Sequence, residues 1–177
     1  DPEMSRGLGD VYKRQFEILN YDCCKDYNSI EEYLKTSVAA GKISEEYAGL
    51  INLKRFEEFL QTDLGKRMGS AYKKGLLFRE QPFIMELGAD MIDKEYPSDE
   101  KILVQGIVDA FFFEDDKVYI VDYKTDRVEQ GKAGEKALVE RYHKQLELYA
   151  DTISRVTGKE TGGCYIYSTC LKKEILI

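Results

Sequence analysis

The stretch GIVDAFFFEDDKVYIVDYKTD, residues 106–126, places acidic residues inside two strongly apolar segments. Both segments are rich in β-branched and aromatic residues, and the polar turn EDDK separates them, so together they predict a β-hairpin. Asp109 interrupts the first predicted strand, and Asp122 interrupts the second. Because a buried carboxylate without a partner costs several kcal/mol, acids at these two positions indicate a functional site.

The alternation of side chains along a strand predicts how these acids are arranged. Asp122 and Lys124 share one face, and a turn at residues 114–117 brings Asp109 opposite Asp122. Like charges directly opposite each other destabilise a sheet, and a bound divalent cation removes that repulsion. Carboxylate oxygens suit Mg²⁺, with Mn²⁺ as an alternative. A lysine on the same face could then orient an attacking water or stabilise negative charge on a phosphate, as in metal-assisted phosphodiester hydrolysis.

A purely structural explanation of the same residues is also open. Asp122 and Lys124 could form an ion pair on an edge strand, and Asp109 could lie at a bulge. For an isolated Asp-X-Lys this explanation is the better one. The second acid, in the opposite strand, shifts the interpretation towards a site.

Composition sets the broad class of the protein. The chain has 177 residues, of which 43% are hydrophobic and 33% charged, which is enough for one globular domain with a core. No apolar run approaches the ~20 residues of a membrane helix. The four cysteines include the adjacent pair Cys23 and Cys24 and form no secreted disulfide pattern, so we expect a reducing cytoplasm. The net charge of −7 argues against nucleic-acid binding over the whole surface but not against a local basic groove.

The order of the periodic segments predicts an α/β domain around a mixed sheet. Residues 29–74 have a helical period, with helix starts expected at Ser29, Ser44 and Asp63. The pattern then changes to strands at 76–87, 102–113 and 118–124, a helix at 137–158, and strands at 163–171 and 174–177. Residues 1–15 follow neither period, and we expect them to be a non-native or disordered start.

Four segments, taken in order, resemble the PD-(D/E)XK nuclease superfamily, and within it the RecB-type branch. They are LLFREQPF (76–83), VQGIVDAFF (104–112), VDYKTDRV (121–128) and RYHKQLELYA (141–150). The likeness extends over roughly residues 44–171 and is to the nuclease domains of AddA-type helicase–nucleases. It implies a restriction-endonuclease-like mixed sheet flanked by helices. A helical N-terminal part would cover residues 16–75, and the nuclease core would cover 76–177.

The resemblance also implies a role for each matching residue. Asp109, Asp122 and Lys124 would be the catalytic set, with Asp109, Asp122 and the carbonyl of Tyr123 as metal ligands. The substrate-binding candidates lie mainly on the helix face that looks onto the site, and they are Gln145, Tyr149, Arg141, Tyr142, Thr125 and Glu80. Gln145 and Tyr149 are one helical turn apart. They could equally belong to a packed helix face, and Glu80 could equally form a surface ion pair.

One position departs from the RecB-type pattern. That branch carries a metal-binding histidine ahead of a segment like FEILN (16–20), and Lys13 stands at about this place. Either the native start is missing or the third metal ligand is absent. Eight basic residues are candidates for a groove that binds phosphates: Lys66, Arg67, Lys73, Lys74, Arg127, Lys132, Lys136 and Arg141.

The function that the resemblance implies is a Mg²⁺-dependent DNA exonuclease in the bacterial cytoplasm. It would hydrolyse single-stranded DNA during double-strand break processing and recombinational repair, together with an AddB-like partner protein. The chain has no glycine-rich P-loop, so a helicase motor is expected upstream in a longer protein. The alternatives are a stand-alone or CRISPR-associated RecB-like nuclease, and a catalytically impaired nuclease fold that only binds DNA.

Overall fold

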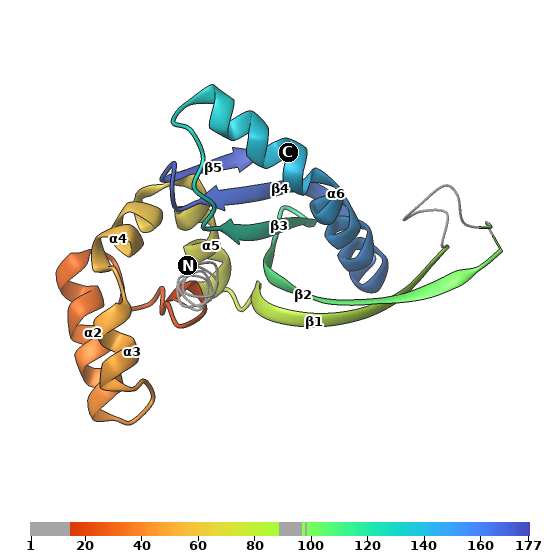
Figure 1. Ribbon diagram of the computed structural model, residues 1–177. Coiled ribbons are helices and arrows are strands. Elements are labelled where there is room, and N and C mark those ends of the chain that lie inside the picture. The colour runs from red at the N-terminus through yellow and green to blue at the C-terminus, as the bar shows by residue number, and fades with distance from the viewer. Residues whose placement is uncertain (1–14, 89–96, 98) are drawn as a thin grey trace.

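The computed structural model describes residues 15–88, 97 and 99–177 (Figure 1). Lys13 and all but one residue of the predicted non-native start lie outside this part of the chain, so those two predictions concern residues that the structure does not describe. Within the described residues, no helix is long and apolar enough to cross a membrane.

A series of helices precedes the sheet: α2 (Tyr27–Ala39), α3 (Glu45–Leu50), α4 (Leu53–Gln61) and α5 (Asp63–Lys73). Short polar side chains set their starts because such side chains accept hydrogen bonds from the first free N–H groups. Asp26, rather than Ser29, caps α2, and Ser29 completes a capping box as the third helical residue. Thr62, rather than Asp63, caps α5.

The helix predicted to start after Ser44 is in fact two helices. Ser44 caps α3 as expected, but the backbone at Ile51 and Asn52 is extended. The side chain of Asn52 then accepts a hydrogen bond from the N–H of Arg55 and starts α4. A second capping residue inside the periodic segment therefore breaks the helix.

The sheet is mixed and has the order β1-β2-β3-β4-β5. Its strands are β1 (Leu77–Gly88), β2 (Lys101–Glu114), β3 (Lys117–Lys124), β4 (Glu160–Ser168) and β5 (Lys173–Leu176). The long helix α6 (Lys132–Thr157) connects β3 to β4, which pair in parallel, whereas the other neighbours are antiparallel. The predicted α/β class, a restriction-endonuclease-like mixed sheet flanked by helices, is confirmed.

Two hydrophobic clusters hold the helices to the two faces of the sheet (Figure 1). On one face, Phe56 and Phe59 of α4 pack with Phe112 and Tyr167 of the sheet. On the other face, α6 packs on the central strands through a separate cluster that includes Leu138, Leu146, Val118, Ile120 and Ile166. Because α6 covers the face to which Val118 and Ile120 point, the even-numbered residues that follow them on β3 point towards α6.

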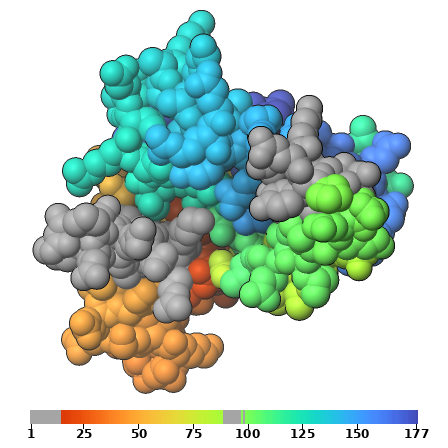
Figure 2. All heavy atoms as spheres, turned by 45° about the vertical axis from the view of Figure 1, so that its right-hand side comes forward, coloured from red at the N-terminus to blue at the C-terminus, as the bar shows by residue number. Residues whose placement is uncertain are grey.

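Strands β1 and β2 form a long hairpin that extends beyond the other strands (Figure 1). On one face of this hairpin, Phe83 packs edge-on against Tyr149 of α6, with ring centres 5.5 Å apart. The surfaces of α6 and β2 are both visible on the face of the molecule shown in Figure 2. The side chains between these two elements form the region that contains the candidate site.

Candidate active site

Asp109 and Asp122 lie next to each other in the register of the hairpin. The β2–β3 pairing runs from Glu114–Lys117 to Ala110–Val121, and the two acids are the next residues beyond that last pair. Asp109 is 8% exposed and Asp122 is 1% exposed. The carboxylate of Asp109 reaches across the hairpin, because its Oδ2 accepts a hydrogen bond from the backbone N–H of Tyr123 at 2.9 Å. The register predicted from the turn is therefore the one observed.

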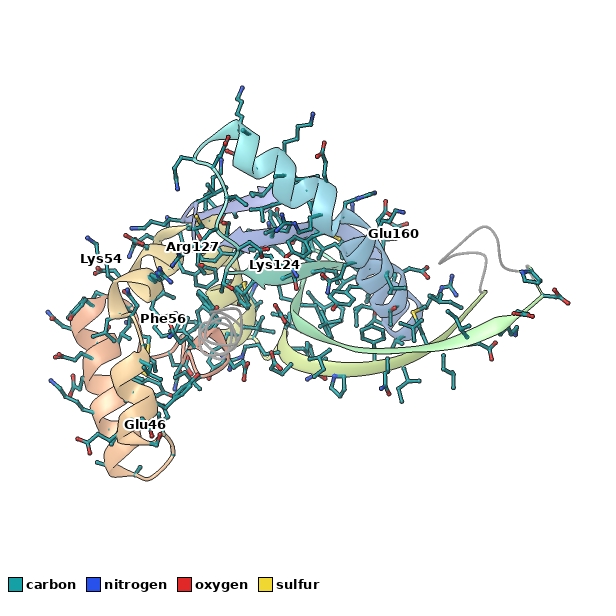
Figure 3. The ribbon with its side chains drawn as sticks, viewed as in Figure 1. Glu46, Lys54, Phe56, Lys124, Arg127 and Glu160 are labelled. Carbon is teal, nitrogen blue, oxygen red and sulfur yellow. The ribbon has the colours of Figure 1, made fainter. Side chains whose placement is uncertain are left out.

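Lys124 is the last residue of β3, and its side chain is buried beside Asp122. Its Nζ lies 2.6 Å from Oδ2 of Asp122 and donates a hydrogen bond to Oε1 of Gln145 at 3.0 Å. The same atom is 3.8 Å from the centre of the Tyr142 ring. Figure 3 labels Lys124 near the centre of the molecule. The ammonium group is thus enclosed by one strand neighbour and two residues of α6.

Gln145 and Tyr149 share the face of α6 that looks onto the sheet, as their spacing predicts. Nε2 of Gln145 donates a hydrogen bond to the Tyr149 hydroxyl at 2.6 Å, and Oε1 accepts the bond from Lys124. Tyr149 is 8% exposed. The two residues therefore extend the polar contacts of Lys124 into the interface between helix and sheet, and their role in substrate binding stays a prediction.

Arg141 and Tyr142 are tied to Asp126, a residue for which the sequence predicts no role. The Tyr142 hydroxyl lies 2.8 and 2.9 Å from the two carboxylate oxygens of Asp126. Nη1 of Arg141 donates to Oδ1 of the same carboxylate at 2.6 Å. Burial, followed by the hydrogen bond to Asp126, raises the pKa of Tyr142, so the phenol stays protonated and can donate. Sixteen positions separate Asp126 from Tyr142, and no local pattern in the sequence connects them.

The other predicted residues surround this group at different depths. The Tyr123 side chain points to the opposite face, where it stacks on Phe16 with ring centres 4.3 Å apart. Thr125 is half-buried and directly follows Lys124. Glu80 stands on β1 at the position facing Asp109, between the pairs Arg79–Ala110 and Gln81–Val108. Its backbone φ of +50° is unusual for a residue other than glycine and marks an irregular point in the strand beside the site.

Arg67 does not belong to the candidate basic groove. Its guanidinium group lies 2.6 Å from Oε2 of Glu114 and 2.7 Å from the Tyr165 hydroxyl. It also lies over the ring of Tyr119, with its central carbon 4.3 Å from the ring centre. Each nitrogen of the guanidinium group donates to Glu114 or Tyr165 and so serves the contact between α5 and the sheet. The other basic residues remain as groove candidates.

The chemistry of the donors decides which metal the site could hold. Within the part of the chain that the structure describes, no group of three or more His, Cys, Asp or Glu side chains is arranged to hold a metal ion. Mg²⁺ needs less than this, because it keeps several waters and takes one or two protein carboxylates together with substrate oxygens. Asp109 and Asp122 are two buried carboxylates on neighbouring strands. These two side chains therefore fit a magnesium-like ion that is completed by water and substrate.

The chain is similar to several AddA proteins, each named as part of an ATP-dependent helicase/nuclease. The protein from Clostridium perfringens (strain SM101 / Type A) is 40% identical over 152 residues, which cover 83% of this chain and 12% of the relative. The protein from Lachnoclostridium phytofermentans is 30% identical over 202 residues, covering 96% and 14%. The protein from Listeria monocytogenes serotype 4a is 33% identical over 164 residues, covering 90% and 13%. This chain thus spans about an eighth of the length of these relatives.

The superfamily match covers more of the chain than the site does. Residues 14–174 match the PD-(D/E)XK nuclease superfamily, a range that includes the helices α2–α5 as well as the sheet. The observed mixed sheet and the acids and lysine at the end of its central hairpin agree with that match. The chain therefore belongs to the PD-(D/E)XK nuclease superfamily.

Proposed function

We propose that this chain is a metal-dependent deoxyribonuclease that hydrolyses phosphodiester bonds in single-stranded DNA, with Mg²⁺ as its ion and Mn²⁺ as an alternative. The observation that supports this most strongly is the meeting of Asp109, Asp122 and Lys124 at one buried point between the β2–β3 hairpin and α6. Outside a catalytic site, two buried acids and a buried lysine would be an expensive choice for the core of a sheet.

Each residue has a distinct part in the proposed reaction. Asp109 and Asp122 hold the cation, together with the carbonyl of Tyr123. When bound, such an ion supplies Lewis acidity at a phosphoryl oxygen. Lys124 presents a fixed positive charge to the phosphate as negative charge develops on it, and Gln145 holds the lysine in place through its 3.0 Å hydrogen bond.

The relatives support a setting for this activity. Their name joins a helicase and a nuclease in one polypeptide, and this chain covers 12–14% of their length. We therefore infer that the chain acts as the exonuclease part of a longer helicase–nuclease that receives single strands from its motor. An AddB-like partner and a role in double-strand break processing in the bacterial cytoplasm complete this proposal.

A matched pair of variants tests the proposed activity. Asp122→Asn removes a carboxylate at the site, and Asp116→Asn removes an exposed carboxylate from the turn of the same hairpin. Cleavage of end-labelled single-stranded DNA is measured with Mg²⁺, Mn²⁺ or EDTA, and binding of the same DNA is followed by fluorescence anisotropy. We expect Asp122→Asn to abolish cleavage and keep DNA binding, whereas Asp116→Asn cleaves normally. Equal cleavage by the two variants would remove the basis of the proposal.

A further inference from the structure

The position of Lys124 depends on more than its two polar partners. Asp122 and Gln145 approach its ammonium group from the strand and from the helix. The Tyr142 ring covers a third side at 3.8 Å, and the whole lysine side chain is 8% exposed. Attraction between a cation and an aromatic face is stronger in such a desolvated place than at the surface. The ring thus helps to determine where the ammonium group can lie.

Asp126 holds this ring in place. Both of its carboxylate oxygens lie within 2.9 Å of the Tyr142 hydroxyl. Only one residue separates Asp126 from Lys124 along the chain, so its negative charge could itself attract the ammonium group. Arg141 prevents this, because it donates to the same carboxylate at 2.6 Å from a position where its own side chain is 54% exposed. The carboxylate is therefore occupied by Tyr142 and Arg141.

We propose that Asp126 is a positioning residue, which holds the Tyr142 ring against Lys124 and thereby fixes the lysine between Asp122 and Gln145. This inference rests on the proposed nuclease function and deepens it, because it assigns Tyr142 to the support of Lys124 and not to direct contact with DNA. Arg141 completes the arrangement by neutralising Asp126. It can do so while its exposed side faces solvent.

Variants of α6 and of the segment after β3 separate this role from two simpler ones. Asp126→Asn and Tyr142→Phe both weaken the anchor of the ring, and Tyr142→Leu removes the ring. Glu140→Gln is the matched control, because it makes the same kind of change on the solvent side of α6, where Glu140 is 67% exposed. Circular dichroism and thermal unfolding show whether each variant is folded.

The first readout is the NMR signal of the lysine side chains, labelled with ¹³C at Cε and assigned by its loss in Lys124→Ala. A proton that lies over an aromatic ring is displaced upfield from the other lysine signals. We expect this displacement in the wild-type chain and in Glu140→Gln, a reduced displacement in Asp126→Asn and Tyr142→Phe, and none in Tyr142→Leu. An unchanged signal in folded Asp126→Asn would overturn the proposal, whether or not the chain cleaves DNA.

The second readout is single-turnover cleavage of labelled single-stranded DNA at saturating enzyme, together with the Kd for that DNA. Misplacing a reacting group by about 1 Å lowers a rate about 100-fold, so we expect Asp126→Asn and Tyr142→Leu to lose about 10- to 100-fold in rate with little change in Kd. A weaker Kd with an unchanged rate would mean that Tyr142 contacts DNA, and it would overturn the positioning role. A folded wild-type chain that shows the NMR displacement but no cleavage would refute the proposed function and leave the anchoring of the ring by Asp126 established.

Discussion

Replacing Lys124 with methionine tests the electrostatics of the site without any need for activity. Its Nζ lies 2.6 Å from Asp122 in a place where both side chains are at most 8% exposed. At an effective dielectric constant of about 20, that contact is worth about 6 kcal/mol of attraction, most of which offsets the desolvation of the two groups. Lys124→Met keeps the length of the side chain but leaves Asp109 and Asp122 without the cation. We expect it to lower the free energy of unfolding by about 3–5 kcal/mol.

The assay is urea unfolding at pH 7 in EDTA, followed by circular dichroism. Wild type, Lys124→Met, Asp122→Asn and the double variant form a thermodynamic cycle. The double variant should cost less than the sum of the two single variants by about 2 kcal/mol, because residues in contact couple by about 0.5–3 kcal/mol. If the two single effects add to within about 0.5 kcal/mol, the buried ion pair does not exist in solution and the reasoning is wrong.

The same cycle, repeated with Mg²⁺, tests whether the ammonium group stands where a cation's charge is needed. A ligand present at about 100 times its Kd stabilises the folded state by about 2.7 kcal/mol. Lys124→Met should gain more stability from Mg²⁺ than wild type does, because the ion no longer competes with a lysine for Asp122. The double variant, which lacks the carboxylate, should gain least. Equal gains in all four proteins would place the bound ion elsewhere.

Two further predictions concern the core. Phe59 is fully buried and packs edge-on against Phe16 and Tyr167, so Phe59→Ala should cost about 3–5 kcal/mol in urea unfolding; a loss below about 1 kcal/mol would mean that this cluster is loosely packed. Burial raises the pKa of the Cys164 thiol from 9.0 to about 11, so the unfolded chain loses this proton first and the folded state is weakened as pH rises from about 9 to 11. Urea midpoints at pH 8 and pH 10 should therefore fall less in Cys164→Ala than in wild type, and an equal fall would exclude this thiol as a cause.

Local patterns were enough to predict the hairpin and its acids. The alternation of apolar residues and the length of the turn determine which residues face each other, so Asp109 and Asp122 could be placed side by side before any fold was known. The spacing of Gln145 and Tyr149 similarly determines a shared face of α6. These features follow from the backbone geometry of a single strand or helix.

The features that the sequence did not reveal depend on contacts between distant segments or on competition between neighbours. Asp126 meets Tyr142 only because α6 crosses the end of β3, and Arg67 is drawn out of the predicted groove by Glu114. The helix starts were missed for a different reason. Thr62 and Asp63 are both good capping residues, and only the geometry of the preceding chain selects between them.

The most direct test of the central claim is cleavage of labelled single-stranded DNA by the wild-type chain and by Lys124→Ala, each with Mg²⁺, with Mn²⁺ and with EDTA. A metal-dependent nuclease should cut only when a divalent ion is present, and it should lose that activity when Lys124 is replaced. Cleavage that persists in EDTA, or that proceeds at the wild-type rate in Lys124→Ala, would contradict the assignment of this buried site to the reaction.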